Sequence, residues 1–564
     1  MKQGLWLLAL ALFLPFVTRA EDASATQATV TFNKDIAPII YRSCAPCHHR
    51  GEATPFELIR YADVAKRAQQ ILDVTSDAYM PPCPPITGHG YPKLIGARSL
   101  NDNDLELIRR WVSEGAKEGA PADLPPAPQW TSEWQLGPPD LVVEMAKTYN
   151  LPVDGKDIYR NFVIQSPVQE RRYVRAIEFR PESRAAHHVF IETDHSHQSR
   201  LKEAAQQTPG FPGEMPEGPE MPAGQFLTWQ PGKKASISPA GMPWVLDQGT
   251  DLVLEAHMRP TGRIEPIRFK VGLYFTNQPP QRAAYRLVLT SLMVDIPPDA
   301  TNFVVERSFT LPVDCEALAV LPHCHLLGRE VEGHADLPDG SRQPLILITN
   351  WDFNWQGDYR FQKPVKLPRG STLRMQITYD NSTNNPRNPN HPPKRVQYGS
   401  QFTDEMAELS FLLLPERAED EKALYTADQK SKFDMGVLRN EEDVRENPTN
   451  AEARVKLGGI LLAQRKTDEA RKQIERALEL DSNFERAHYF AGLVARLQKR
   501  LPDAEREFQT CLRLDASDAK AWGNLGFVQI GLGDVKAARQ SLQHAVEINP
   551  SDQLSRNALD QINK

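Results

Sequence analysis

Apolar and polar positions follow three different patterns along the 564-residue chain. In residues 27–118 the apolar side chains recur every three or four positions, most clearly at 35–41 and 105–116, which is typical of amphipathic helices. Residues 119–139 are rich in proline, which indicates a linker. We therefore expect a small all-α domain at 27–118, followed by this linker.

After the linker the pattern changes to short apolar runs separated by Pro, Gly and Asn turns. Runs such as LVLEAHM and LRMQITY, with alternating polar positions, are typical of strands. The length of this region is enough for one large or two smaller sandwiches, and two are favoured. We therefore expect two all-β domains, jelly-roll-like sandwiches, at 140–283 and 284–416, which meet near residues 279–286.

The last part of the chain repeats with a period of 34 residues. Small residues at fixed columns let paired helices pack closely, and this period resembles that of tetratricopeptide repeats. We expect an α-solenoid at 447–564 after a connecting helix at 417–446. Helical repeats expose a concave face, so we expect a protein partner there; the alternative is a solubilising or oligomerising appendage. The aligned residues are Ala453, Ala487, Ala521; Gly458, Gly492, Gly526; Ala470, Ala504, Ala538; and Ala477, Cys511, Ala545.

The first twenty residues indicate export. Lys2 precedes an apolar run at 5–17, and Ala20 is a small residue suited to cleavage, so 1–20 is interpreted as a signal peptide. The run is shorter than the roughly 20 residues that span a bilayer, although an uncleaved anchor remains the alternative. No later segment is apolar enough to span a membrane. The net charge of -7 gives no basic footprint for nucleic acid.

Cys44, Cys47 and His48 lie in the sequence Cys-Ala-Pro-Cys-His. This is the spacing at which two thiols bond the vinyl groups of a c-type haem and the next imidazole ligates its iron. A redox-active or zinc-binding cysteine pair is the alternative, but the chain has no second pair of this kind and is exported. We expect one covalent haem c, which together with export indicates a bacterial periplasmic or secreted protein.

The sixth iron ligand is predicted to be Met80. It lies in Ala-Tyr-Met-Pro-Pro, before the second helical run, where small cytochromes c place their methionine ligand. A thioether ligand raises the haem potential. His89 and His49 are competing ligands, and His49 is expected to point away because it follows the proximal histidine directly.

The β region carries five histidines in suggestive places: His187, His188, His257, His323 and His325. Side chains alternate along a strand, so the last two point the same way and can share one metal. The adjacent pair would point to opposite faces unless the strand bulges or ends there. Taken singly, each histidine is more often a packed or surface residue.

The order His-His, His, His-x-His and Asp-Glu-Met, over residues 140–415, resembles the copper type II, ascorbate-dependent monooxygenases, the family of peptidylglycine hydroxylating monooxygenase and dopamine β-monooxygenase. The resemblance implies two coppers. His187, His188 and His257 would hold the electron-transfer copper. The catalytic, oxygen-activating copper would be held by His323, His325 and Met406. Imidazole suits both copper oxidation states and thioether favours Cu(I).

The chain departs from the peptide-hydroxylating pattern at three positions. Leu321 replaces an arginine that grips a substrate carboxylate, and Glu408 and Ser410 replace an asparagine and a tyrosine. Losing a cation and gaining an acid argues against a carboxylate substrate; Glu408 would meet an amine or lie on the surface.

Other residues carry weaker predictions. Trp351, Phe353 and Trp355 are expected to pack in the core or at an edge, with a pocket as the alternative. A Cys315–Cys324 disulfide stays open. The spare histidines, expected at the surface or behind a ligand, are His195, His197, His334 and His391.

Two functions follow from these patterns. The first is a copper-dependent monooxygenase that hydroxylates a C–H bond of a small substrate with O2, with the haem as the point where electrons from an external donor enter. The second is a non-enzymatic haem and copper redox adaptor that docks a protein through its repeats. All six copper-ligand positions are filled, which favours the enzyme.

Overall fold

The computed structural model describes most of the chain. Among these residues no helix is long and apolar enough to cross a membrane. The predicted signal peptide, Cys83 and His89 lie outside the described residues. Those described are 28–50, 52, 54–82, 85–88, 90–130, 134–213, 218–549 and 552–563.

The chain begins with a small helical unit around a core that includes Ile36 and Trp111. Asn101 starts its last helix with a capping box, in which its side chain accepts from the Asp104 N–H and the Asp104 carboxylate accepts in return. The unit's elements are η1 (Phe32–Ile36), α1 (Ala37–Ser43), α2 (Tyr61–Ala65), α3 (Ala68–Ser76) and α4 (Asp102–Ser113).

Two sheets that share one apolar core follow, and we call them the first sheet pair. A short helix, α5 (Gln198–Ala204), and a two-stranded sheet of β2 (Tyr149–Leu151) and β11 (Glu265–Ile267) lie beside them. One sheet holds β1 (Leu141–Glu144), β12 (Lys270–Thr276), β4 (Arg172–Arg180), β8 (Ser236–Ile237) and β9 (Trp244–Leu246), and the other β6 (Phe211–Pro212), β3 (Ile158–Gln165), β10 (Asp251–Met258), β5 (Ala186–Asp194) and β7 (Thr228–Trp229).

A second sheet pair begins after β12, with a separate core. The change of sheet falls within residues 277–284. A short turn, η3 (Phe353–Trp355), and the paired strands β14 (Asp295–Ile296) and β21 (Val396–Gln397) complete it. One of its sheets holds β13 (Tyr285–Thr290), β22 (Glu408–Pro415), β16 (Cys315–His323) and β19 (Tyr359–Leu367). The other holds β15 (Phe303–Thr310), β20 (Thr372–Tyr379), β17 (Gly328–Asp336) and β18 (Arg342–Ile348).

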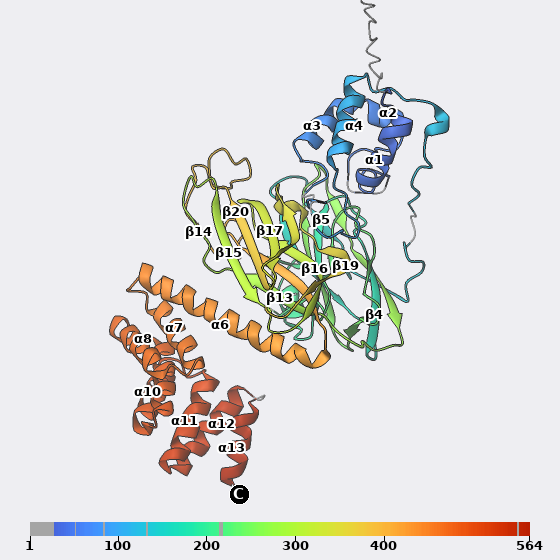
Figure 1. The fold of residues 1–564 in the computed structure, drawn as a ribbon. Coiled ribbons are helices and arrows are strands. Elements are labelled where there is room, and N and C mark those ends of the chain that lie inside the picture. Colours follow the sequence, from blue (N-terminus) through green and yellow to red (C-terminus); the bar gives the residue numbers. More distant parts are fainter. Residues whose placement is uncertain are drawn as a thin grey trace, which may run out of the picture.

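The helical unit sits on one end of the β-rich body and touches both sheet pairs (Figure 1). The Ile95 N–H donates to the Arg360 carbonyl of the second pair at 2.8 Å. On the first pair, Gly232 packs so closely on the Cys47 turn that a Cβ there would lie 2.7 Å from the Cys47 Sγ. The helical unit is therefore docked, because backbone atoms of both sheet pairs contact it.

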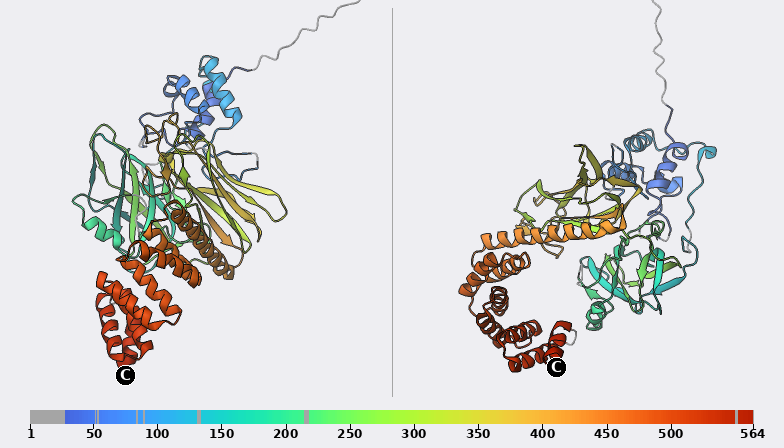
Figure 2. Two further views of the ribbon diagram at one scale, coloured as in Figure 1. Left: turned by 90° about the vertical axis from the view of Figure 1, so that its left-hand side faces the viewer. Right: turned by 60° about the horizontal axis from the view of Figure 1, so that its bottom comes forward.

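Helices fill the rest of the chain, as the period-34 pattern predicts. After η4 (Ala418–Asp420), a long helix lies along the second sheet pair, where Tyr285 donates to Asp428 at 2.6 Å. The following helices form an arc at the end opposite the helical unit (Figure 2). The long helix is α6 (Glu421–Glu446), and the helices of the arc are α7 (Ala451–Ala463), α8 (Thr467–Leu480), α9 (Glu485–Leu497), α10 (Leu501–Leu514), α11 (Ala519–Leu532), α12 (Val535–Ile548) and α13 (Gln553–Asn563).

Gly492→Ala tests why the repeats need small residues. A Cβ at Gly492 would lie 2.7 Å from the buried Phe508 ring, so we expect a loss of about 1–3 kcal/mol in the free energy of unfolding. Urea unfolding followed by circular dichroism measures it. Gly436→Ala in α6 is the control: its Cβ meets Ile460 at 3.5 Å, and removing a helix glycine should stabilise by about 0.5–1 kcal/mol. Equal effects of the two substitutions would contradict the packing argument.

Candidate metal centres

One cavity of about 320 Å³ is lined by Cys44, Cys47, His48 and Met80. The first three lie in the turn that follows α1, and Met80 lies in the loop after α3. Met80 and the turn that carries Cys44, Cys47 and His48 are more than thirty residues apart in the sequence but line the same cavity. The four residues predicted to hold a haem are brought together, and the competitor His49 instead stacks on Trp130, with ring centroids 4.1 Å apart.

The chemistry of this cavity fits a haem. The Nδ1–H of His48 donates to the Phe56 carbonyl at 3.2 Å, which leaves Nε2 as the acceptor nitrogen. Burial lowers the pKa of His48, so its imidazole is neutral. Apolar side chains line most of the cavity, and the cations that line it suit the carboxylates of a haem. These cations are Arg67, Arg98 and Arg184.

Three histidines of the first sheet pair form a second group. The register of β5 against β10 shifts here, because His257 lies opposite His188 whereas Met258 lies opposite Ala186. His187 is thus the extra residue of a β-bulge, the feature needed for adjacent histidines to share a face. The His257 ring lies 5.1 Å from that of His187 and 5.0 Å from that of His188, centroid to centroid.

Hydrogen bonds fix which nitrogens of this group can bind a metal. His257 Nε2 pairs with the Asp157 carboxylate at 2.9 Å, and His188 Nδ1 donates to the Asn354 carbonyl at 3.2 Å. Nδ1 of His257 and Nδ1 of His187 are buried without a hydrogen-bond partner among the described residues. Burial lowers the pKa of His187 to about 4. Buried, neutral imidazoles with a bare nitrogen fit a soft or borderline metal.

The spacing of the three histidines is wider than a bound metal requires. In the part of the chain that the structure describes, one group of His, Cys, Asp or Glu has ligand atoms all within 4.8 Å of one another, and it lies in the repeats: Glu485, Cys511 and Asp518. Asp518 there caps α11 by accepting from two backbone N–H groups, which explains its position. Binding one ion between the histidines therefore requires their rings to rotate inward.

A third group lies at the end of β16. The rings of His323 and His325 are 5.2 Å apart and nearly perpendicular. His323 Nδ1 donates to the Gln356 side-chain oxygen at 2.5 Å, and its Nε2 is buried with no partner in the described chain. His325 Nδ1 donates to the Asp404 carbonyl at 3.0 Å. Burial lowers the pKa of His325 to about 3, so its imidazole is neutral.

Glu405 ties the predicted thioether to this pair. Its buried carboxylate accepts from the backbone N–H of His325 at 2.8 Å and of Leu327 at 2.6 Å, and it directly precedes Met406. The Tyr379 hydroxyl donates to the Met406 carbonyl at 2.5 Å. Met406 is 4 % exposed. The donor set of this group fits copper: His323 has a bare imidazole nitrogen, His325 is a neutral imidazole on the turn that Glu405 holds, and a buried thioether directly follows Glu405.

The η3 turn and the residue after it contact the cavity, the three-histidine group and the group of His323 and His325. Trp355 lines the cavity that also includes His187, and their rings lie 6.0 Å apart. Trp355 is half-buried and packs against the core of the second sheet pair, as predicted, and it also lines the cavity, which was the alternative. Trp351 is buried, as predicted. The cavity lined by Cys44, Cys47, His48 and Met80 and the three-histidine group therefore share a wall.

Sequence patterns missed the residues that support the ligands. Asp157, Gln356 and the Asn354 carbonyl each hold an imidazole, but they lie 100, 33 and 166 positions from their partners. No spacing signal could link them. Glu405 could have been found from the sequence, because it is the central residue of the Asp-Glu-Met motif.

The positions that depart from the peptide-hydroxylating pattern lie beside the third group. Glu408 is opposite His323 in the sheet and accepts from the Thr290 hydroxyl at 3.0 Å. Leu321 and Ser410 face each other across the same strands and are both buried. The Glu408 carboxyl group therefore lies next to the histidine pair. Leu321 and Ser410 lie nearby and offer no positive charge to bind a substrate carboxylate.

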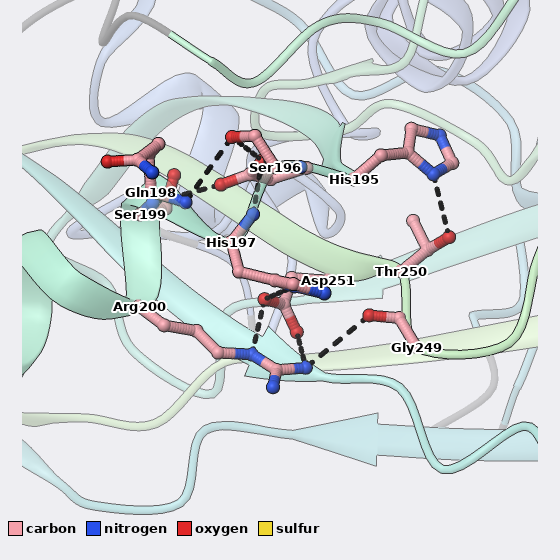
Figure 3. Close-up of polar contacts among 10 residues, drawn as sticks. His195, Ser196, His197, Gln198, Ser199, Arg200, Gly249, Thr250 and Asp251 are labelled. Carbon is pink, nitrogen blue, oxygen red and sulfur yellow. Dashed lines mark hydrogen bonds and ion pairs between the residues drawn. The ribbon is translucent and has the colours of Figure 1, made fainter. Parts of the chain in front are cut away.

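Two spare histidines lie far from the three groups, at the other end of β5. Figure 3 shows His195 turned toward Thr250 and Arg200 holding the buried Asp251. His197 Nδ1 also faces Asp251, at 3.3 Å. This corner is structural, and about 20 Å of strand separates it from His188.

The remaining spare residues have structural surroundings. His391 is exposed, as predicted, whereas His334 is buried beside Glu332, so a surface position is wrong for it. Cys315 forms no disulfide, which leaves no Cys315–Cys324 bridge.

Comparison with known proteins identifies the C-terminal region. Tetratricopeptide-repeat models match residues 444–483, 455–510 and 519–552, so this part of the chain consists of tetratricopeptide repeats. A crystal structure of MamA is 20 % identical, with a TM-score of 0.23, and the match covers 24 % of this chain and 78 % of that one.

Two curated proteins are similar to part of the chain. The anaphase-promoting complex subunit 3 of Schizosaccharomyces pombe is 30 % identical over 143 residues, which are 25 % of this chain and 21 % of that protein. The cell division cycle protein 27 homolog of Caenorhabditis elegans is 33 % identical over 95 residues, 17 % of this chain and 12 % of the homolog. The chain thus spans 21 % and 12 % of the length of these two relatives.

Gln356→Leu tests the hydrogen bond that orients His323. Without the amide oxygen the imidazole loses its fixed tautomer, so copper affinity at this site should fall about 10–100-fold. Competition with a copper chelator measures it. Gln376→Leu, on β20 in the other sheet of the same pair, is the matched control and should keep the wild-type affinity. A normal affinity in Gln356→Leu would refute this role.

Asp194→Asn tests the corner in Figure 3. Burial raises the pKa of Asp194, but hydrogen bonds from Ser196 and Ser199 outweigh it and lower the pKa to about 2. A lowered pKa stabilises the fold above the unfolded value near 4, and this stability is lost as the pH falls toward 2. The variant should therefore be about 1–3 kcal/mol less stable at pH 7 and match the wild type near pH 2. Denaturant unfolding across pH measures this, with exposed Asp154→Asn as the control.

Proposed function

We propose that this chain is an exported, copper-dependent monooxygenase with a fused c-type cytochrome domain and two copper-holding β-sandwich domains of jelly-roll type. The observation that carries the proposal is the shared wall: the cavity lined by Cys44, Cys47, His48 and Met80 is also lined by His187. A redox cofactor in that cavity would lie against the three-histidine group. Bacterial periplasm or secretion is the proposed location.

Each group has its own set of holding residues. Cys44 and Cys47 would attach the haem, with His48 and Met80 as the axial ligands, and when bound it supplies one-electron transfer from an external donor. Two coppers, when bound, supply electron storage and O2 activation for hydroxylation of a C–H bond. One would be held by His187, His188 and His257, and the other by His323, His325 and Met406.

The chain's own residues prepare these sites. Asp157 and Gln356 accept the ring proton of one imidazole in each group, which fixes the tautomer and turns the other nitrogen inward. Glu405 holds the turn that carries His325. Burial lowers the pKa of His187, His188 and His325, which keeps these imidazoles in the neutral form that binds a metal.

The surroundings of His323 limit the substrate. Glu408 is the charged side chain opposite His323, and Leu321 lies where an arginine would grip a carboxylate. An acid repels an anionic substrate and attracts a cation. We infer a small neutral or amine-bearing substrate.

The tetratricopeptide arc is proposed to bind a protein partner. This arc also supports the second candidate function, a non-enzymatic haem and copper redox adaptor, because docking would need no chemistry from the β domains. Metal analysis separates the two candidates. One haem and two coppers per chain are expected for the enzyme. A chain that binds no copper after copper loading would exclude the enzyme and favour the adaptor.

Met406→Ala tests the catalytic assignment. Losing the thioether should abolish copper-dependent O2 consumption, a fall of at least about 100-fold, because thioether stabilises Cu(I). The haem absorption spectrum should stay unchanged, since Met406 belongs to the second sheet pair. Met293→Ala, in the loop after β13, is the control and should consume O2 normally. Unchanged O2 consumption in Met406→Ala would refute the site.

A further inference from the structure

A continuous row of aromatic rings joins the two histidine groups. The Tyr159 ring stacks on the His257 ring, with centroids 4.4 Å apart and planes 4° apart. The Phe353 ring lies 5.8 Å from Tyr159 and 5.3 Å from His325, centroid to centroid. Each ring is therefore in contact range of the next, from one candidate metal site to the other.

The fold fixes this row from both sides. The register of β10 against β3 places His257 directly opposite Tyr159, so the stacked pair is a cross-strand pair. Phe353 comes from the η3 turn of the second sheet pair and is 2 % exposed. The row thus crosses from one sheet pair to the other through packed protein.

An internal electron path would have two steps, one from the cavity to the three-histidine group and one between the two histidine groups. The two steps differ in whether side chains must bridge them. His187 itself lines the haem cavity, so no ring has to stand between the haem and the three-histidine group. The step from His257 to His325 crosses between sheet pairs and has only Tyr159 and Phe353 in the row. Electron tunnelling falls steeply with distance and more steeply across gaps than through packed atoms. These two rings therefore offer a packed route for the second step, beside the hydrogen-bonded route from His188 through residues 354–356 to His323.

We propose that Tyr159 and Phe353 form the electron bridge between the two histidine groups, an inference that rests on the proposed function. One electron crosses per step. With copper bound in both groups, the copper of the three-histidine site would be oxidised by one electron, and the copper of the site of His323, His325 and Met406 would be reduced by one. No bond is made or broken, and Tyr159 keeps its phenolic proton. The electron comes from an external reductant through the haem cavity.

Phe353→Leu tests the bridge, because leucine keeps an apolar side chain and removes the ring. The full-length protein with ferric haem and two Cu(II) is mixed with ascorbate without O2. Haem absorbance follows the first step, and freeze-quenched electron paramagnetic resonance follows Cu(II). The direct reaction of ascorbate with copper, measured in a Cys44→Ser/Cys47→Ser variant that lacks haem, is subtracted.

The wild type should lose its whole Cu(II) signal at one rate. The Phe353→Leu variant should lose half of its Cu(II) signal at that rate and the other half at least about tenfold more slowly. Tyr159→Leu, on the other sheet pair, should behave the same, so a folding defect in one variant does not decide the result. Tyr159→Phe keeps the ring and should match the wild type.

Two outcomes overturn the bridge in different ways. If both leucine variants bind two coppers with an intact haem spectrum and lose Cu(II) at the wild-type rate, the bridge is wrong and the proposed function stands. If the wild type binds no copper, or its haem passes no electron to copper, the proposed function fails and the bridge fails with it.

Discussion

The hydrogen bonds that fix the buried imidazoles are the constraint on which the β-rich body depends. His257, His188, His323 and His325 each bond through one ring nitrogen, and two of the four acceptors come from residues 354–356. Burying an imidazole with both nitrogens unpaired would destabilise the fold, and pairing both would leave no site. The turn after β18 therefore has to lie between the two sheet pairs for either histidine group to be formed.

A buried ion pair holds that turn in place. Lys233 of the first sheet pair donates to Asp358, two residues beyond Gln356, and the Thr228 hydroxyl donates to the same carboxylate at 2.7 Å. Burial raises the pKa of Asp358, but the cations Lys233 and Arg360 outweigh it and keep the carboxylate charged. Because a lone buried charge is strongly destabilising, this pair fixes the relative position of the two sheet pairs more firmly than apolar contact alone.

The sequence carries the local patterns well and the long-range contacts poorly. Period-34 small residues predict the repeats, and strand alternation predicts that His323 and His325 share a face. The bulge at His187 depends on pairing with β10, which one strand's sequence cannot reveal. Asp157 and Gln356 look like ordinary polar residues, because only the fold brings them to an imidazole. Trp355 resembles a core tryptophan for the same reason: its role depends on where the helical unit docks.

The positions of the helical unit and the repeats separate two tasks in space. The helical unit, whose Cys44–His48 turn lines the cavity, lies at one end of the β-rich body, and the tetratricopeptide arc lies at the other (Figures 1 and 2). Helix α6 ties the arc to the second sheet pair through Tyr285 and through Arg307, which donates to Ser431 at 2.7 Å. A protein held by the arc would therefore leave the cavity accessible, so an electron donor and a docked partner could engage the chain together. On the proposed function, the repeats would set where the enzyme is held, and the shared wall at His187 would set how electrons reach it.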